Sequence, residues 1–69
     1  MVEIAAPAEM VGQTLQELNL RARFGINVIA LRSRDGETNI SPGAEDKICA
    51  GDMIVAVGDT QALKKIGWI

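Results

Sequence analysis

The sequence contains no histidine and no tyrosine, and Cys49 is its only cysteine. Neither a disulfide nor a Cys/His zinc site can therefore form within one chain. Catalysis would depend on carboxylates, serines, threonine and lysines, among which no paired-carboxylate spacing stands out. We therefore expect no enzyme activity, no metal and no cofactor. The isolated thiol is typical of a reducing compartment, which favours a cytosolic location.

Long apolar runs and strongly basic runs are also missing. The longest nearly apolar stretch, Ile26–Leu31, is interrupted by Asn27 and is far shorter than the roughly 20 residues that a membrane span needs. Seven basic and nine acidic side chains give a net charge of −2, and the longest basic run is Lys64–Lys65. This balance gives little electrostatic support to phosphate-backbone binding, so we expect no nucleic-acid partner.

The length of 69 residues allows one domain at most. A domain of this size buries only about 60% of the surface that its unfolded chain exposes, so its stability is marginal without a supplement. Since cross-links are excluded, oligomerisation is the remaining supplement. The apolar residues Trp68 and Ile69 end the chain, and a free terminus rarely displays such residues without a partner. We therefore expect residues 1–69 to be one lobe cut from a longer protein.

Apolar patterns predict the strands. Alternation from Val2 to Ala6 predicts a first strand that ends at a proline. Val28–Leu31 and Glu37–Ile40 are expected to form an antiparallel hairpin around an Asp-Gly turn. Met53–Val57 is continuously apolar, which is typical of a central strand covered on both faces.

Capping signals predict the helices. Thr14 and Glu17 form a T-x-x-E capping box, and Gly25 is suited to the C-terminal end of the segment. Asn19 leaves two possibilities, one continuous helix or two short helices that break there. Thr60 is expected to cap a short final helix. The helical face consists of Val11, Leu15, Leu18 and Ala22. The predicted fold is thus α/β (α+β), a small homodimeric lobe with a β-α-β-hairpin-β core and a short C-terminal helix.

Two kinds of side chain are candidates for ligand contacts. Arginine presents a planar fork of donors that suits phosphate or carboxylate, although surface solvation is the more ordinary interpretation of these side chains. Asn27 is polar at the entrance to a strand, where it either caps the turn or presents its amide to a ligand. The arginines concerned are Arg21, Arg23, Arg32 and Arg34.

The residues in order resemble a known family. The block "GQTLQELNLRARFGINVIAL" and its spacing through "ISP" to "AGDMIVAVGD" resemble the TrkA-C domain, the C-terminal lobe of RCK (regulator of potassium conductance) modules. The resemblance covers Val2–Leu63. It implies a regulatory, non-enzymatic lobe that dimerises and serves a membrane potassium transporter or channel. It also implies a cytoplasmic location, peripheral to or tethered on the inner face of the cell membrane through the parent protein.

The resemblance also implies a ligand site. Some members bind cyclic di-AMP between paired lobes, with the arginine on a phosphate, the following asparagine on an adenine edge, and apolar side chains around the base. In this sequence Asn19 and Phe24 stand where nucleotide-binding members often have Asp and Tyr. Carried over by position, the site residues are Leu15, Asn19, Leu20, Arg21, Ala22, Phe24, Asn27, Val28 and Pro42.

Two alternatives remain open at this point. The first keeps the fold and discards the ligand, so that the chain is a purely structural dimerisation lobe. The second belongs to another class, because "SPGAEDKICAGDMIVAVGD" also resembles a segment of PDZ peptide-binding domains. A PDZ domain needs about 90 residues and a Gly-Leu-Gly-Phe-like carboxylate loop, neither of which this sequence contains.

Overall fold

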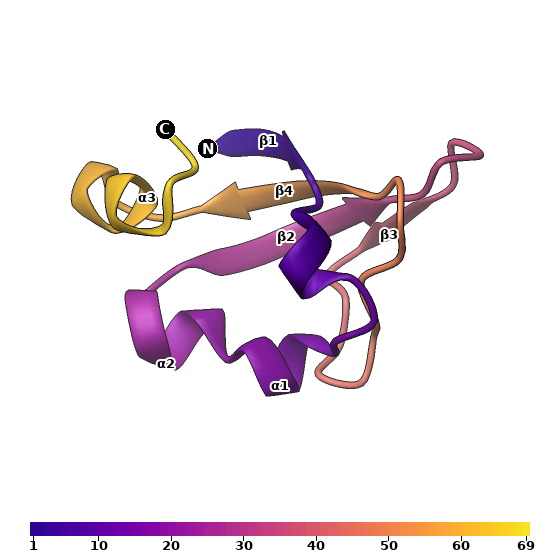
Figure 1. Cartoon of the computed structure of the whole chain (residues 1–69), viewed down its shortest axis with the longest axis horizontal. Coiled ribbons are helices and arrows are strands. Elements are labelled where there is room, and N and C mark those ends of the chain that lie inside the picture. Colours follow the sequence, from indigo (N-terminus) through magenta and orange to yellow (C-terminus); the bar gives the residue numbers. More distant parts are fainter.

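Four strands form where the apolar patterns predict them, and they pair into one antiparallel sheet. The computed structural model describes residues 1–69, and the sheet order is β1-β4-β2-β3 (Figure 1). The predicted β-α-β-hairpin-β core with a C-terminal helix is confirmed. The elements are β1 (Val2–Ala5), the 3-10 helix η1 (Ala8–Met10), α1 (Leu15–Leu18), α2 (Leu20–Phe24), β2 (Asn27–Arg32), β3 (Thr38–Ile40), β4 (Met53–Val57) and α3 (Thr60–Ile66).

The hydrophobic core lies between the sheet and the helical layer that runs below it in Figure 1. Ile26, Ile48 and Ile54 are the large side chains that are fully buried, and Leu18 and Leu20 reach the same cluster from α1 and α2. Burial of apolar area is the main favourable contribution to folding in a chain this small. No helix of the structure has the length and apolar character required to cross a membrane.

The helical segment after Thr14 consists of two short helices, which is the second of the two predicted possibilities. Thr14 and Glu17 form the predicted capping box, with both reciprocal hydrogen bonds present. Asn19 has a φ of 49°, in the left-handed region, and separates α1 from α2. Asparagine tolerates this conformation better than most residues, so the break occurs at the residue least suited to continue the helix. Gly25, with a φ of 72°, ends α2 as predicted.

Strand β4 is central, as predicted, but the expectation that both its faces are covered is wrong for the single chain. Ile54 and Ala56 point into the core and are 0% exposed. On the opposite face Val55 is only half-buried, and Val57 is 41% exposed. The helices and η1 supply a layer on one side of the sheet only. The outer face of the sheet therefore lacks a covering layer within the chain.

The C-terminal segment differs from two expectations. Asp59, and not Thr60, is the N-cap of α3, because its side chain accepts a hydrogen bond of 2.7 Å from the Ala62 N–H. Trp68 is only 8% exposed, because the chain turns back at Gly67 and the Trp68 N–H donates to the Leu63 carbonyl. The core of this chain therefore covers Trp68 without an outside partner. Ile69 remains 56% exposed.

Candidate functional site

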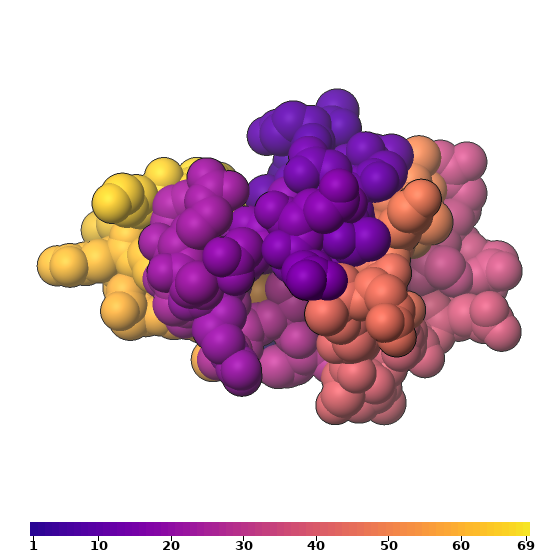
Figure 2. Space-filling view, turned by 90° about the horizontal axis from the view of Figure 1, so that it is seen from below, coloured from indigo at the N-terminus to yellow at the C-terminus, as the bar shows by residue number.

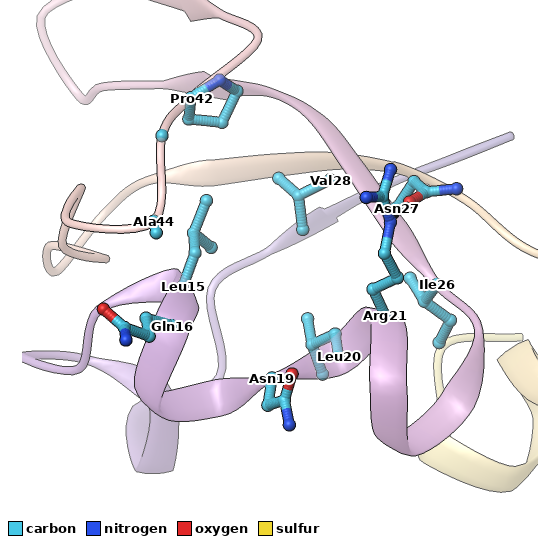
Figure 3. Close-up of a pocket in the computed structure, with 11 residues that line it drawn as sticks. Leu15, Gln16, Asn19, Leu20, Arg21, Ile26, Asn27, Val28, Pro42 and Ala44 are labelled. Atoms are coloured by element: carbon cyan, nitrogen blue, oxygen red, sulfur yellow. Dashed lines mark hydrogen bonds between the residues drawn. The ribbon is translucent and has the colours of Figure 1, made fainter.

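A cavity of about 380 Å³ lies between the two short helices, the start of β2 and the loop that follows β3 (Figure 3). Figure 2 looks onto this helical face, where the purple helical segment and the salmon loop lie on either side of a hollow. The residues that line the cavity are Leu15, Gln16, Asn19, Leu20, Arg21, Ile26, Asn27, Val28, Pro42, Gly43 and Ala44.

Apolar side chains form much of the wall. Leu15, Val28 and Pro42 converge on the centre of the cavity from α1, β2 and the loop (Figure 3). Leu20 is 5% exposed and closes the inner end, where it is part of the core. Apolar walls of this kind accept a flat, weakly polar group such as an aromatic base.

Backbone hydrogen bonds hold the loop against α1. The first amides of α1 have no partners within the helix, as at every helix N-terminus. Here the Leu15 N–H donates to the Asp46 carbonyl at 3.1 Å and the Gln16 N–H donates to the Ala44 carbonyl at 2.9 Å. Ser41, with a φ of 57°, turns the chain just before Pro42. The ring of Pro42 is thereby placed opposite Leu15.

Arg21 is the only charged residue in the lining. Its Nε donates a hydrogen bond of 2.7 Å to the Asn27 side-chain oxygen, and the two side chains lie next to each other in Figure 3. The one ion pair in the chain joins Arg32 to Glu3 at 3.8 Å, so no carboxylate neutralises Arg21. A cavity with a single cation and no acid favours an anionic ligand, and guanidinium pairs well with phosphate or carboxylate.

The structure brings most of the predicted site residues together, and two of them lie outside the cavity. Ala22 is exposed and does not line it. Phe24 is half-buried against the core, and the Arg23 guanidinium carbon lies 5.1 Å from the centre of its ring. The predicted residues that line the cavity are Leu15, Asn19, Leu20, Arg21, Asn27, Val28 and Pro42.

The prediction missed four lining residues. Gly43 and Ala44 directly follow Pro42, and Gln16 directly follows Leu15, so chain neighbours of the predicted residues were the available signal. Ile26 directly precedes Asn27 and carried the same signal, although it is 1% exposed and belongs mainly to the core.

A second cavity, of about 420 Å³, lies at the other end of the hairpin. Its lining is mostly polar, and Asp46 and Asp52 already accept hydrogen bonds from backbone amides of Gly43 and Cys49. No group of three or more His, Cys, Asp or Glu side chains is placed to hold a metal ion. The lining residues are Leu31, Ser33, Glu37, Thr38, Asn39, Asp46, Lys47, Cys49 and Asp52. The first cavity, with its apolar walls and unpaired guanidinium, is the better candidate site.

Known proteins share both the sequence pattern and the fold. Ktr system potassium uptake protein C of Bacillus subtilis is 34% identical over 65 residues, which are 94% of this chain and 29% of that protein. The RCK C domain of the potassium transport protein KtrA, solved in complex with cyclic di-AMP, is 35% identical with a TM-score of 0.86, and the match covers 94% of this chain and 75% of that one. This chain thus spans less than a third of the length of the Bacillus relative.

A third relative bears on the nucleic-acid expectation. The RCK C domain dimer of Streptococcus agalactiae BusR, also with cyclic di-AMP, is 30% identical with a TM-score of 0.79, and the match covers 93% of this chain and 80% of that one. BusR has also been solved with promoter DNA, and there this chain covers 32% of the BusR chain. The expectation that no nucleic acid is a partner is therefore not supported for longer proteins that contain this domain.

The family comparison agrees with these structures. The sequence model of the TrkA-C domain matches residues 1–67, almost the whole chain, which assigns the chain to this family and not to the PDZ alternative. The resemblance of the "GQTLQELNLRARFGINVIAL" block and the observed sheet with its broken helix lead to the same assignment. The chain belongs to the TrkA-C domain family.

Proposed function

We propose that this chain is a regulatory lobe of a potassium transport protein, and that two copies of it bind cyclic di-AMP between them. The observation that carries the proposal is the cavity, in which one unneutralised guanidinium stands beside apolar walls. A phosphate pairs with Arg21, while Leu20, Val28 and Pro42 enclose the base. In two related structures the same domain is complexed with cyclic di-AMP.

A second copy completes the site. One cavity offers one arginine, whereas cyclic di-AMP carries two phosphates and two bases related by symmetry. Two solvent-exposed apolar side chains are close in sequence to residues that line the cavity. Ile29 is 37% exposed and follows Val28. Ile40 is 75% exposed at the end of β3, shortly before Pro42. An isologous dimer that covers Ile29 and Ile40 brings two cavities close together.

The regulatory action follows from differential binding. A ligand held between two lobes favours the dimer geometry that it binds best, and its effect on the parent protein cannot exceed that difference in affinity. No catalytic step is part of this proposal. In this proposal residues 1–69 act as one lobe of a longer cytoplasmic or membrane-tethered protein. The length agrees with this, because the chain spans 29% of the Bacillus relative.

The experiment is a thermal unfolding series with cyclic di-AMP, and with AMP and ATP for comparison. Ligand at about 100 times its Kd adds about 2.7 kcal/mol, which raises the Tm of a chain this size by about 10 °C or more. Arg21→Ala should abolish the shift. Arg34→Ala is the matched control, because Arg34 lies over Gly51 and outside the cavity.

A purely structural dimerisation lobe is the second candidate function. The exposed apolar outer face of the sheet favours this structural function, because a face of this kind is typical of a protein–protein interface whether or not a ligand is bound. No Tm shift at millimolar cyclic di-AMP, together with a stable dimer, would decide for this second function.

A further inference from the structure

Asp52 is the one charged residue that the fold buries, at 6% exposure, and no cation in the chain forms an ion pair with it. We propose that the second cavity binds a small organic cation, whose guanidinium or ammonium group pairs with the Asp52 carboxylate. The site contains none of the residues that line the first cavity, so the proposal is independent of the proposed function. Its ligand carries the opposite charge to the ligand that suits Arg21.

The Asp52 carboxylate is only partly satisfied within the chain. Its Oδ2 accepts a hydrogen bond of 2.9 Å from the Cys49 N–H, and its Oδ1 accepts none. An ionised carboxylate has about four acceptor positions, and buried charges in proteins are normally paired. The Cys49 amide is neutral and supplies no counter-charge. A cationic donor at Oδ1 provides what the chain itself does not.

The free oxygen of Asp52 opens onto the second cavity. No fully buried side-chain nitrogen or oxygen lacks a hydrogen-bond partner, so the unpartnered Oδ1 must reach open space. Asp52 is otherwise buried and lines the cavity of about 420 Å³, so the cavity is the space that Oδ1 reaches. Small-molecule sites typically have volumes of about 300–1,000 Å³.

The rest of the lining is richer in acceptors and in negative charge than in cations. Glu37 and Asp46 are the other carboxylates, and Lys47 is the single cation, exposed and without an ion pair. Asn39 donates its amide nitrogen to Asp46 at 3.1 Å, and its side-chain oxygen accepts no hydrogen bond. Guanidinium and ammonium groups carry several N–H donors and no acceptor. They therefore match this lining, whereas an anion does not.

The cavity favours an organic cation over a metal ion. It lies between the β2–β3 hairpin and the loop before β4, at the end of the molecule opposite α3 (Figure 1). Leu31, on the core side of β2, supplies an apolar surface beside the carboxylates. The alkyl part of an organic cation packs on such a surface while its charged head pairs with an acid. No cluster of three or more ligating side chains is placed for a metal.

The first test is an NMR titration of the chain with agmatine, which carries a guanidinium and an ammonium group, at constant ionic strength. We expect the amide signals of Asn39, Cys49 and Asp52 to shift and to saturate at about millimolar agmatine, as for a small ligand with few contacts. Tetramethylammonium, a cation without an N–H donor, is the control and should give no saturable shift. Absence of a saturable shift with agmatine, or the same shift with tetramethylammonium, would overturn the proposal.

The second test removes the buried charge. Asp52→Asn keeps the shape of the side chain and an oxygen for the Cys49 N–H, and it should raise the Kd for agmatine about tenfold or more, the usual loss of a hydrogen bond to a charged group. Glu45→Gln removes the same charge from an exposed residue of the same loop outside the cavity, and it should leave the Kd nearly unchanged. Equal losses in both variants would show general attraction between charges and reject the site.

A third variant keeps the proposal testable if Asp52→Asn does not fold. The Glu37 side chain lines the cavity, is exposed and forms no hydrogen bond or ion pair, so its replacement does not disturb the fold. Glu37→Gln should raise the Kd for agmatine about 2- to 5-fold, the size of an exposed ion pair. A Kd equal to that of Glu45→Gln would contradict the proposal.

Discussion

Glu17 stabilises the start of α1 through its carboxylate. The Thr14 backbone N–H and hydroxyl both donate to this carboxylate, at 2.8 and 3.1 Å, and these bonds hold the pKa of Glu17 below its ordinary value of 4.5. The unfolded chain therefore binds this proton more tightly than the folded chain. The contribution to stability is complete above about pH 4.5 and is lost as the pH falls through the lower folded pKa of Glu17.

Glu17→Gln tests this contribution, because glutamine keeps a side-chain acceptor that does not titrate. We expect the Tm of the variant to decline less between about pH 5 and pH 3 than that of the wild type. Asp35, whose pKa is lowered by a hydrogen bond from Ser33, keeps part of the decline in both proteins. Equal declines in thermal unfolding scans would show that the capping box does not supply the pH dependence.

At the scale of elements, the break between α1 and α2 depends on one backbone conformation. Asn19 adopts a left-handed φ of 49°, in which a residue with a plain Cβ is strained. We expect Asn19→Ala to lower the free energy of unfolding by about 1 kcal/mol and Asn19→Gly to leave it nearly unchanged. Chemical denaturation measures both. Wild-type stability of Asn19→Ala would mean that the two helices can merge into one without cost.

The elements were more predictable from the sequence than their mutual positions. Thr14, Glu17 and Gly25 carry local signals, and each lies where its signal placed it. The cavity instead depends on backbone bonds such as that from Gln16 to Ala44, which leave no pattern in the side chains. The Arg21–Asn27 bond likewise crosses from a helix to a strand. Only the family resemblance grouped these residues in advance, and it included Ala22 and Phe24, which do not line the cavity.

At the scale of the whole molecule, one face of the sheet has no covering layer within the chain, whereas a fold that is stable as a monomer covers its apolar sheet faces itself. The chain has an accessible surface of 4410 Å², and a stable interface of standard size covers about 800 Å² per partner. Ile40 is 75% exposed on β3, and Val57 is 41% exposed on β4. Apolar side chains on the outer face supply the non-polar centre that such an interface needs.

Ile40→Lys tests whether this face forms the proposed dimer. A charge in the centre of an interface should raise the dimer Kd about tenfold or more, since desolvating it is unfavourable. The fold of the monomer should remain, because Ile40 makes few contacts within the chain at 75% exposure. Sedimentation equilibrium measures the Kd, and circular dichroism checks the fold. Gln61→Lys adds the same charge at an exposed position of α3 and should leave the Kd unchanged. If Ile40→Lys dimerises like the wild type, the two copies meet on another surface and the cavities are not joined across this face.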